Sequence, residues 1–352
     1  MTAEFFGLFR CIFLLTFMGL VCAACTPVHV PSDQANTVQI DVTDRYGNRV
    51  QLQKPAQRIV CLFEASADDL YMLGAGSALV GIPAKIYSAP DLYHAYSILD
   101  RRIAQKQIAT PSNWEASTNI ESVVALQPDL VVVNAGQTDV IKVLQKMQIP
   151  VYAVMSENLQ QTRKELHDLG ALTGRSERAR QLLQFIDAEI AAMNAKKHNT
   201  TQQKTVYYGW SGGRIFSTSG IDSMPNTVMT LAGARNVVTT SIDQPNVNPE
   251  KLLEWNPDVI LLWNSRPEQI YERPELKTLS AVQHRQVYNL RPTFLFNPHT
   301  PKILLAANQL QHWLSGSVDV HQDAAHDMQR ILSEFYGATH AAQFIHMAQS
   351  KE

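Results

Sequence analysis

One pattern occurs twice in this chain, first as Asn119-Ile-Glu-Ser-Val-Val-Ala-Leu-Gln-Pro-Asp129-Leu-Val-Val-Val133 and again, without a gap, as Asn248-Pro-Glu-Lys-Leu-Leu-Glu-Trp-Asn-Pro-Asp258-Val-Ile-Leu-Leu262. In each copy an Asn can cap a short helix, a Glu follows in the first turn, and Pro-Asp ends the turn before a run of aliphatic residues. Such runs are typical of buried parallel strands. The repeat predicts two similar α/β lobes with a cleft between them.

Length and charge restrict the class of protein. The 352 residues are enough for two domains that each bury a core. The 30 Lys and Arg residues nearly balance the 32 Asp and Glu residues, so no broad basic field is present to hold nucleic acid. Nucleic acid is therefore not expected as a partner.

The first residues predict export. A single Arg precedes an apolar stretch at 11–24, which is too short for an ordinary spanning helix and has the length of a signal-peptide core. The stretch ends in Val21-Cys-Ala-Ala-Cys25, which resembles the bacterial lipobox, although Cys22 stands where that pattern prefers Leu. We expect residues 1–25 to be a lipoprotein signal peptide that ends at a lipidated Cys25, followed by a tether at 26–37. Cleavage to a soluble secreted protein and retention as an uncleaved anchor are the alternatives, and all three place the folded part in the periplasm or at the cell surface.

The mature body keeps one cysteine, Cys61, within the aliphatic run 59–63. One thiol cannot build a disulfide framework. Because no His or Asn context marks Cys61 as a nucleophile, we interpret it as a small apolar core residue.

Four segments are expected after the tether: an N-terminal α/β lobe at 38–160, a bridging helical segment at 161–198, a C-terminal α/β lobe at 199–320 and a C-terminal helix at 321–352. In the first lobe, Arg58–Phe63 is predicted to be a strand and Ser66 to cap the helix that follows.

The bridging segment carries apolar residues at helical spacing: Leu182, Phe185, Ile186, Ile190 and Met193. An ordinary crossover helix would show the same pattern. The position of the segment between two matching halves favours a rigid helix that joins the lobes.

Several short motifs follow one another in a set order: Asp44-Arg-Tyr-Gly47, Pro55-Ala-Gln-Arg-Ile-Val60, Leu73-Gly-Ala-Gly76, Leu79-Val-Gly81, the two Pro-Asp units, Leu231-Ala-Gly-Ala-Arg-Asn-Val237 and Phe335-Tyr-Gly337. In order and spacing, from about residue 38 to 337, they resemble the substrate-binding proteins of ABC importers for iron complexes and corrinoids, the class III periplasmic binding proteins. The resemblance implies two Rossmann-like lobes with parallel sheets, joined by a single long bridging α-helix, with the ligand cleft between them. It also implies a monomeric, non-enzymatic protein that delivers its ligand to a permease with its ATPase.

The same resemblance implies an acidic residue on each lobe that meets basic residues of the permease. The first acidic position falls at Asp68. The second falls at Thr227, which is not acidic, so the second docking contact differs here. An acidic surface residue without a partner would be only a solvated charge.

Ligands of open α/β sheets bind on the loops that follow the carboxyl ends of the strands. By this rule, the candidate ligand-binding residues are Glu64, Tyr87, Trp114, Trp210, Arg214, Trp263, Arg266, Phe296 and His299.

Aromatic faces at Trp114, Trp210 and Trp263 can flank a planar chelate or macrocycle, and Arg214 and Arg266 can meet carboxylates or an anionic complex. Alternatively, the tryptophans cap the cores of the lobes and the arginines extend into water. The adjacent run 211–213, Ser-Gly-Gly, would let backbone amides approach a ligand closely, which also suits an oxyanion such as molybdate.

A bare metal ion is a competing ligand. Of the 11 His residues only His94 and His299 fall on candidate cleft loops, and two imidazoles fall short of a usual metal site unless Glu64 or Asp91 joins them. A metal that arrives already chelated needs few protein ligands or none, so no metal site or cofactor of the protein itself is expected. A ferric siderophore or similar iron chelate is the first expectation, ahead of cobalamin, haem, chelated nickel and molybdate.

An enzyme and a surface interaction protein are the remaining classes. No G-x-S-x-G, H-E-x-x-H, P-loop or G-x-G-x-x-G motif is present. An interaction protein would not need two matched lobes around a cleft, whereas the receptor of an importer does.

Overall fold

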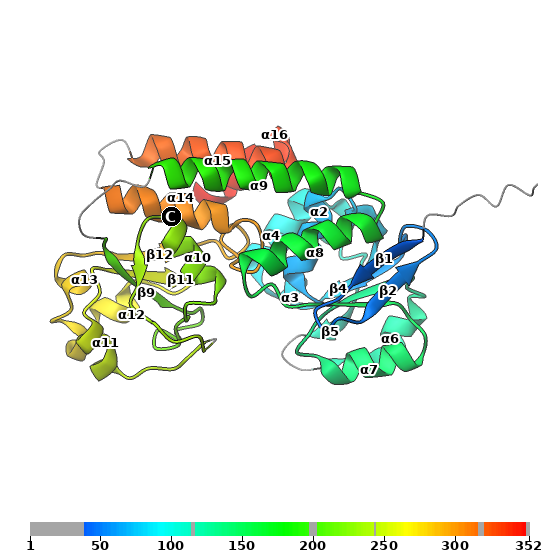
Figure 1. Ribbon diagram of the computed structural model, residues 1–352, viewed down its shortest axis with the longest axis horizontal. Coiled ribbons are helices and arrows are strands. Elements are labelled where there is room, and N and C mark those ends of the chain that lie inside the picture. Colours follow the sequence, from blue (N-terminus) through cyan, green and yellow to red (C-terminus); the bar gives the residue numbers. More distant parts are fainter. Residues whose placement is uncertain (1–38, 114–116, 197–202, 243, 316–319, 350–352) are drawn as a thin grey trace, which may run out of the picture. The chain divides into compact units, whose positions relative to one another are not determined.

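A computed structural model describes residues 39–113, 117–196, 203–242, 244–315 and 320–349, without the side chains of residues 113 and 320–323 (Figure 1). Gln39–Glu352 is one compact unit. The expected signal peptide, the tether, the lipidation residue Cys25 and the ligand candidate Trp114 lie outside the described residues. In the part of the chain that is described, no helix is long and apolar enough to cross a membrane.

The first half contains a six-stranded sheet in the order β6-β5-β4-β3-β7-β8. Its pairs are parallel except β5 with β6. The strands are β3 (Ile59–Cys61), β4 (Leu79–Pro83), β5 (Ala109–Asn113), β6 (Ser117–Thr118), β7 (Leu130–Asn134) and β8 (Val151–Val154). An antiparallel hairpin of β1 (Ile40–Thr43) and β2 (Arg49–Leu52) precedes it.

The second half contains a four-stranded sheet that is parallel throughout, in the order β10-β9-β11-β12. Its strands are β9 (Thr205–Gly209), β10 (Arg235–Asn236), β11 (Val259–Trp263) and β12 (Val287–Leu290). The chain is thus an α/β protein with two mainly parallel sheets, as the repeated pattern predicts.

Helices connect the strands in both halves. In the first half they are α2 (Glu64–Met72), η1 (Gly76–Ala78), α3 (Lys85–Ser88), α4 (Pro90–Leu99), α5 (Arg101–Ala104), α6 (Ile120–Ala125) and α7 (Thr138–Lys146). In the second half they are α10 (Met224–Leu231), α11 (Pro249–Trp255), α12 (Glu268–Tyr271), η2 (Pro274–Leu276) and α13 (Ser280–Gln283). Five longer helices complete the fold: α8 (Leu159–Leu172), α9 (Ser176–Lys196), α14 (Ile303–Ser315), α15 (Val320–Tyr336) and α16 (Ala338–Gln349).

The two copies of the repeated pattern form the same local structure. Asn119 caps α6 by accepting a hydrogen bond from Ser122 N, and Asn248 caps α11 by accepting one from Lys251 N. The carboxylate of Asp129 accepts hydrogen bonds from the amides of Gln57 and Arg58, just before β3. In the second copy Asp258 accepts from the amide and hydroxyl of Thr205, the first residue of β9. Each Pro-Asp turn therefore fastens the start of the neighbouring parallel strand, and we call these two contacts the aspartate clamps.

Two helices occupy the predicted bridging segment. The first, α8, ends before Thr173, and α9 then runs for 21 residues from Ser176. The predicted apolar stripe is confirmed on α9, where Leu182, Ile186 and Met193 are buried. This helix contacts α8 of the first half as well as α10, α14 and α15 (Figure 1).

The C-terminal region also differs from the prediction, which placed a single helix at 321–352. Gly337, at a φ of 85°, separates α15 from α16. A positive φ is readily adopted by glycine, so the chain reverses between two helices that pack on each other.

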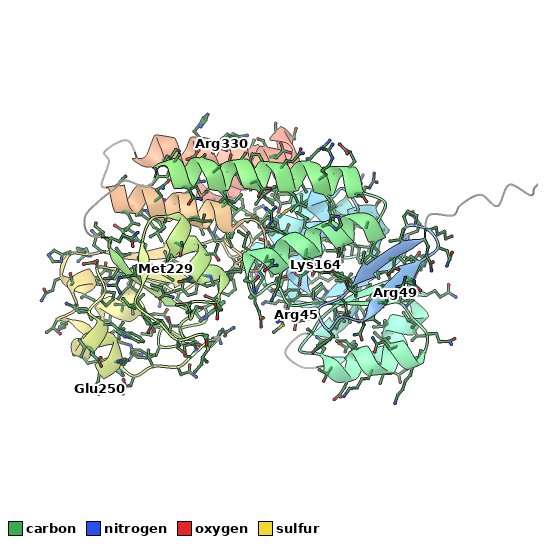
Figure 2. All side chains as sticks on the ribbon, viewed as in Figure 1. Arg45, Arg49, Lys164, Met229, Glu250 and Arg330 are labelled. Atoms are coloured by element: carbon green, nitrogen blue, oxygen red, sulfur yellow. The ribbon has the colours of Figure 1, made fainter. Side chains whose placement is uncertain are left out.

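Apolar side chains fill both halves, as illustrated by the buried Met229 on α10, whereas Arg49 and Glu250 lie exposed (Figure 2). Cys61 is fully buried in β3, and this burial raises the pKa of its thiol to about 12. A thiol that stays protonated at neutral pH is a poor nucleophile, so the interpretation of Cys61 as a core residue is confirmed.

Candidate functional site

An aromatic row connects the two halves at the carboxyl ends of their strands. The ring of His299, from the segment between β12 and α14, lies 6.0 Å from that of Phe63 after β3. Its other neighbour is Trp210 after β9, at 6.2 Å and an interplanar angle of 18°, which is a stacked arrangement. Trp210 in turn meets Trp263, the last residue of β11, edge-on at 5.4 Å. These four residues define the aromatic row.

His299 is held in place from the first half. Its Nδ1 lies 3.2 Å from the carbonyl oxygen of Ser156, and because a carbonyl can only accept, Nδ1 carries the proton. Its backbone amide donates to Asn297 Oδ1 at 2.9 Å. The contact with Ser156 ties the loop after β12 to the loop after β8.

Ser156 has a φ of 52°, which is unusual for a serine. The buried carboxylate of Glu165 on α8 holds it there by accepting hydrogen bonds from the amides of Met155 and Ser156 and from the Ser156 hydroxyl. Burial raises the pKa of Glu165, and these hydrogen bonds oppose the rise. Glu165 therefore fixes the position of Ser156, whose carbonyl oxygen in turn contacts His299 of the aromatic row.

Both tryptophans of the row are packed in the core of the protein, at 3 % exposure for Trp210 and 7 % for Trp263. Trp210 Nε1 donates to Thr218 O at 2.9 Å. Trp263 Nε1 is buried and has no hydrogen-bond partner among the described residues. A buried N–H without an acceptor is costly to the folded state.

Two exposed arginines lie on the loops that follow β9 and β11. Ser265 joins these loops, since its hydroxyl accepts from Gly213 N and donates to Trp210 O. The Arg214 guanidinium donates to Ser211 O and Gln244 Oε1, whereas that of Arg266 has no hydrogen bond or ion pair within the described part of the chain. The predicted arginines are thus both on the second half and both in contact with water.

Glu64 and Tyr87 are engaged in contacts of their own. Helix α2 begins at Glu64, two residues before the predicted cap Ser66, so that prediction is wrong and Ser66 lies buried inside the helix. Glu64 pairs with Lys85 at 3.2 Å beside Phe63. The Tyr87 hydroxyl donates to Ile108 O at 3.1 Å.

Phe296 is buried and lines a separate cavity of about 260 Å³ together with Trp313 and Met328. It therefore does not join His299, although only three positions separate them in sequence.

The predicted docking residue Asp68 does not lie on the surface. Its side chain is 2 % exposed, forms an ion pair with the fully buried Lys302 at 2.6 Å, and accepts a hydrogen bond from Tyr336. Burial raises the pKa of Asp68 and lowers that of Lys302, against the attraction between the two groups. A carboxylate in this position presents no charge to a permease, so the surface placement is corrected here.

The residues considered for a bare metal ion are dispersed. His94 is exposed on α4, Asp91 accepts a hydrogen bond from Thr293 N, and Glu64 is paired with Lys85. No group of three or more His, Cys, Asp or Glu residues that could hold a metal ion occurs in the described ranges.

Three residues of the site escaped the sequence prediction. Phe63 belongs to the segment 63–66 that the strand-end rule selects, but its neighbour Glu64 was chosen from that segment instead. Ser156 and Glu165 take part through contacts with partners distant in sequence, which no local pattern reveals.

Two mainly parallel sheets with an aromatic row at their carboxyl ends are the arrangement expected of a ligand-binding α/β protein. The family model "Periplasmic binding protein" matches residues 59–293, and the chain belongs to this family. It is accordingly the substrate-binding component of an ABC importer, a non-enzymatic protein that works with a permease.

Several similar proteins support this assignment. The uncharacterized ABC transporter substrate-binding lipoprotein YvrC of Bacillus subtilis is 22% identical over 77% of this chain and 84% of its own length. The vitamin B12-binding protein of Salmonella typhimurium is 32% identical over 60% of this chain and 78% of its own length. The molybdate-bound protein MolA of Haemophilus influenzae has a similar fold, with a TM-score of 0.70, 20% identity, and coverage of 84% of this chain and 97% of MolA.

Proposed function

We propose that the protein captures a metal held in an organic chelate, between the two lobes and against the aromatic row, and delivers it to an ABC permease. The observation that carries this proposal is the row itself, in which Phe63 of the first half and Trp210 of the second half both contact His299, and Trp263 packs on Trp210. A ligand bound there would touch the carboxyl ends of both sheets, which is where open α/β sheets bind ligands.

The chemistry around the row favours a bulky complex with acceptor groups. The guanidinium groups of Arg214 and Arg266, exposed on the loops that follow β9 and β11, offer several donors. Guanidinium groups bind carboxylates and other oxyanions through paired hydrogen bonds. A ferric siderophore, whose chelating groups leave a negatively charged complex, is our first candidate.

A corrinoid is the second candidate, because the curated relatives include a vitamin B12-binding protein at 32% identity. A flat macrocycle would also use the aromatic rings of the row.

The protein is proposed to work outside the cytoplasm, anchored by a lipid at Cys25. The supporting observations are the small residues before Cys25 and the similarity to YvrC, which is described as a lipoprotein.

The proposal is tested by titrating the purified protein with a ferric hydroxamate siderophore, a ferric catecholate siderophore, haem, cyanocobalamin, Ni(II)-histidine and molybdate, with tryptophan fluorescence as the readout. We expect saturable quenching by one metal chelate. Trp210→Ala should abolish it, because the stacked partner of His299 is lost.

The matched control is Trp313→Phe, which removes a tryptophan on α14 that stacks on Tyr288 and takes no part in the row. This variant should lose some fluorescence but keep the affinity of the parent protein. Binding of molybdate alone, or equal affinity in the Trp210→Ala variant, would contradict the proposal.

A further inference from the structure

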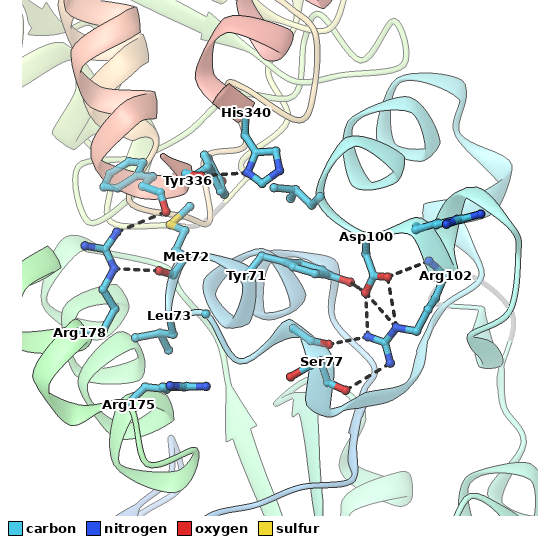
Figure 3. A pocket seen from close by; sticks show the side chains of 15 residues that line it. Tyr71, Met72, Leu73, Ser77, Asp100, Arg102, Arg175, Arg178, Tyr336 and His340 are labelled. Carbon is cyan, nitrogen blue, oxygen red and sulfur yellow. Dashed lines mark hydrogen bonds and ion pairs between the residues drawn. The ribbon is translucent and has the colours of Figure 1, made fainter. Parts of the chain in front are cut away.

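A second cavity, of about 720 Å³, lies between helices of the first half and the C-terminal helices (Figure 3). Its wall is formed by the end of α2, by η1 and α5, by the start of α9 and by the turn between α15 and α16. Helix α2 begins beside Phe63 of the aromatic row and ends at this cavity. Its nine residues span about 13 Å at 1.5 Å per residue, so the cavity is separate from the proposed ligand site.

Positive charge dominates the lining of this cavity. Four arginines contribute to it, namely Arg101, Arg102, Arg175 and Arg178, against Asp100 as the one acidic residue of the lining. Such an excess of one sign in a concave surface attracts ions of the opposite sign.

Two of the four arginines are engaged in holding the fold together. Arg102 forms an ion pair with Asp100 at 2.7 Å and donates to the carbonyl oxygens of Gly76, Ser77 and Leu79. Arg178 pairs with Glu334 at 2.9 Å and donates to Met72 O. Figure 3 shows these two on opposite sides of the cavity.

The other two arginines remain available. The guanidinium groups of Arg101 and Arg175 are exposed, and neither forms a hydrogen bond or an ion pair within the described part of the chain. Arg175 also directly precedes the first residue of the 21-residue helix α9, whose N-terminus carries a partial positive charge. Three sources of positive charge thus border one cavity.

We propose that this cavity is a binding site for a phosphate group. A phosphate carries between one and two negative charges near neutral pH, and its oxygens accept paired hydrogen bonds from several guanidinium groups at once. The phosphate belongs either to a free phosphate compound or to the headgroup of an anionic phospholipid. This inference is independent of the ligand bound at the aromatic row.

The first test is calorimetric titration of the purified protein with pyrophosphate at low ionic strength, where screening is weak. We expect saturable binding with one site. The Arg101→Gln/Arg175→Gln variant should bind at least about tenfold more weakly, which corresponds to about 1.4 kcal/mol. Both side chains are exposed, so the variant should keep the thermal unfolding midpoint of the parent protein.

The control variant is Lys142→Gln/Lys146→Gln, which removes two exposed positive charges from α7, outside the cavity. It should bind pyrophosphate as the parent protein does. Equal weakening in both double variants would assign the effect to net charge and overturn the proposal.

The second test distinguishes the two sources of phosphate. The Cys25→Ser protein, which cannot be lipidated, is sedimented with vesicles of phosphatidylglycerol or of phosphatidylcholine. Sedimentation with phosphatidylglycerol alone, lost in the Arg101→Gln/Arg175→Gln variant, assigns a lipid headgroup. Pyrophosphate binding without sedimentation assigns a free phosphate compound. Absence of both overturns the proposal, whereas chelate binding at Trp210 is tested separately and would be unaffected.

Discussion

Asp69 on α2 carries a buried carboxyl group, and few neighbouring groups stabilise its charged form. It is 1 % exposed, and its Oδ1 has no hydrogen-bond partner among the described residues. Burial raises the pKa of Asp69 well above its ordinary value, and the nearby carboxylates of Asp68 and Glu165 raise it further, against a smaller opposing effect of Lys302. The folded protein therefore binds a proton at Asp69 more tightly than the unfolded chain does.

This difference predicts a pH dependence of stability. As the pH rises above the ordinary aspartate pKa of 3.8, the unfolded chain loses the Asp69 proton first, so the free energy of unfolding falls until the pH passes the higher pKa of the folded state. Asp69→Asn should remove this contribution and stabilise the protein at neutral pH. Urea unfolding between about pH 4 and 7 measures it.

The exposed residue Asp139 on α7 supplies the control, and Asp139→Asn should keep the pH profile of the parent protein. Parallel profiles for the parent and Asp69→Asn would show that Asp69 carries no such penalty.

The buried ion pair of Asp68 and Lys302 leads to a second prediction. Lys302→Met leaves the carboxyl of Asp68 without its partner and should lower the free energy of unfolding by roughly 3 kcal/mol. The double variant Asp68→Asn/Lys302→Met should lose less than the sum of the two single variants, because no unpaired charge remains. Urea unfolding of the four proteins gives the coupling energy. If the losses in free energy of unfolding of the two single variants add up to that of the double variant, the predicted coupling between Asp68 and Lys302 is contradicted.

At the residue scale, the strand-end rule located Trp210, Trp263 and His299, because each comes at or after a buried strand and local sequence marks such strands well. It could not show that Phe296 lines a cavity with Trp313 and Met328 that does not include His299, since the path of a loop depends on distant partners. The burial of Asp68 was hidden for the same reason, because its partner Lys302 comes from the far end of the sequence.

Arg178 on α9 connects three helices. Its guanidinium donates to Met72 O at the end of α2 and to the backbone oxygens of Glu334 and Phe335 near the end of α15. The last carbonyl groups of a helix lack partners within the helix and carry partial negative charge. One arginine therefore caps two helix ends.

Loss of this arginine should weaken the fold. Arg178→Gln should lower the free energy of unfolding by about 1–2 kcal/mol, because charged hydrogen bonds are lost in a position that is only partly screened by water. Arg178→Lys should recover little, since an ammonium group cannot reach both helix ends as the guanidinium fork does. Denaturant unfolding measures both variants.

Arg180→Gln on the same helix is the control. Arg180 pairs with Glu177 on the exposed side of α9, so its loss should leave the unfolding midpoint unchanged. If Arg178→Gln and Arg180→Gln lower the free energy of unfolding equally, the loss comes from the net charge of α9, and the capping role of Arg178 is contradicted.

At the element scale, the two asparagine caps were predictable because the acceptor and the amide it serves are three residues apart in sequence. The start of α2 was not, because the helix begins at Glu64 without a side-chain cap, and Phe63 at its N-cap position carries no capping signal. The division of the C-terminal region into α15 and α16 was marked only by Gly337 within a helical pattern.

For the whole molecule, the contacts of α9 with elements of both halves predict little movement between them. We expect the small-angle X-ray scattering profile of the protein to remain unchanged within error when a saturating chelate is added. Proteins that close by a wide hinge become measurably more compact on binding. A clear decrease in the radius of gyration would therefore contradict a stiff connection.

The aspartate clamps also bear on how such proteins change their ligands over time. Asp129 fastens only strands of the first sheet, and Asp258 fastens only strands of the second. Each aspartate clamp is thus encoded entirely within the half of the sequence that forms its sheet. A chimera that takes one half from this chain and the other from a relative would retain both clamps, so recombination between halves offers a route by which specificity is exchanged without redesigning either sheet.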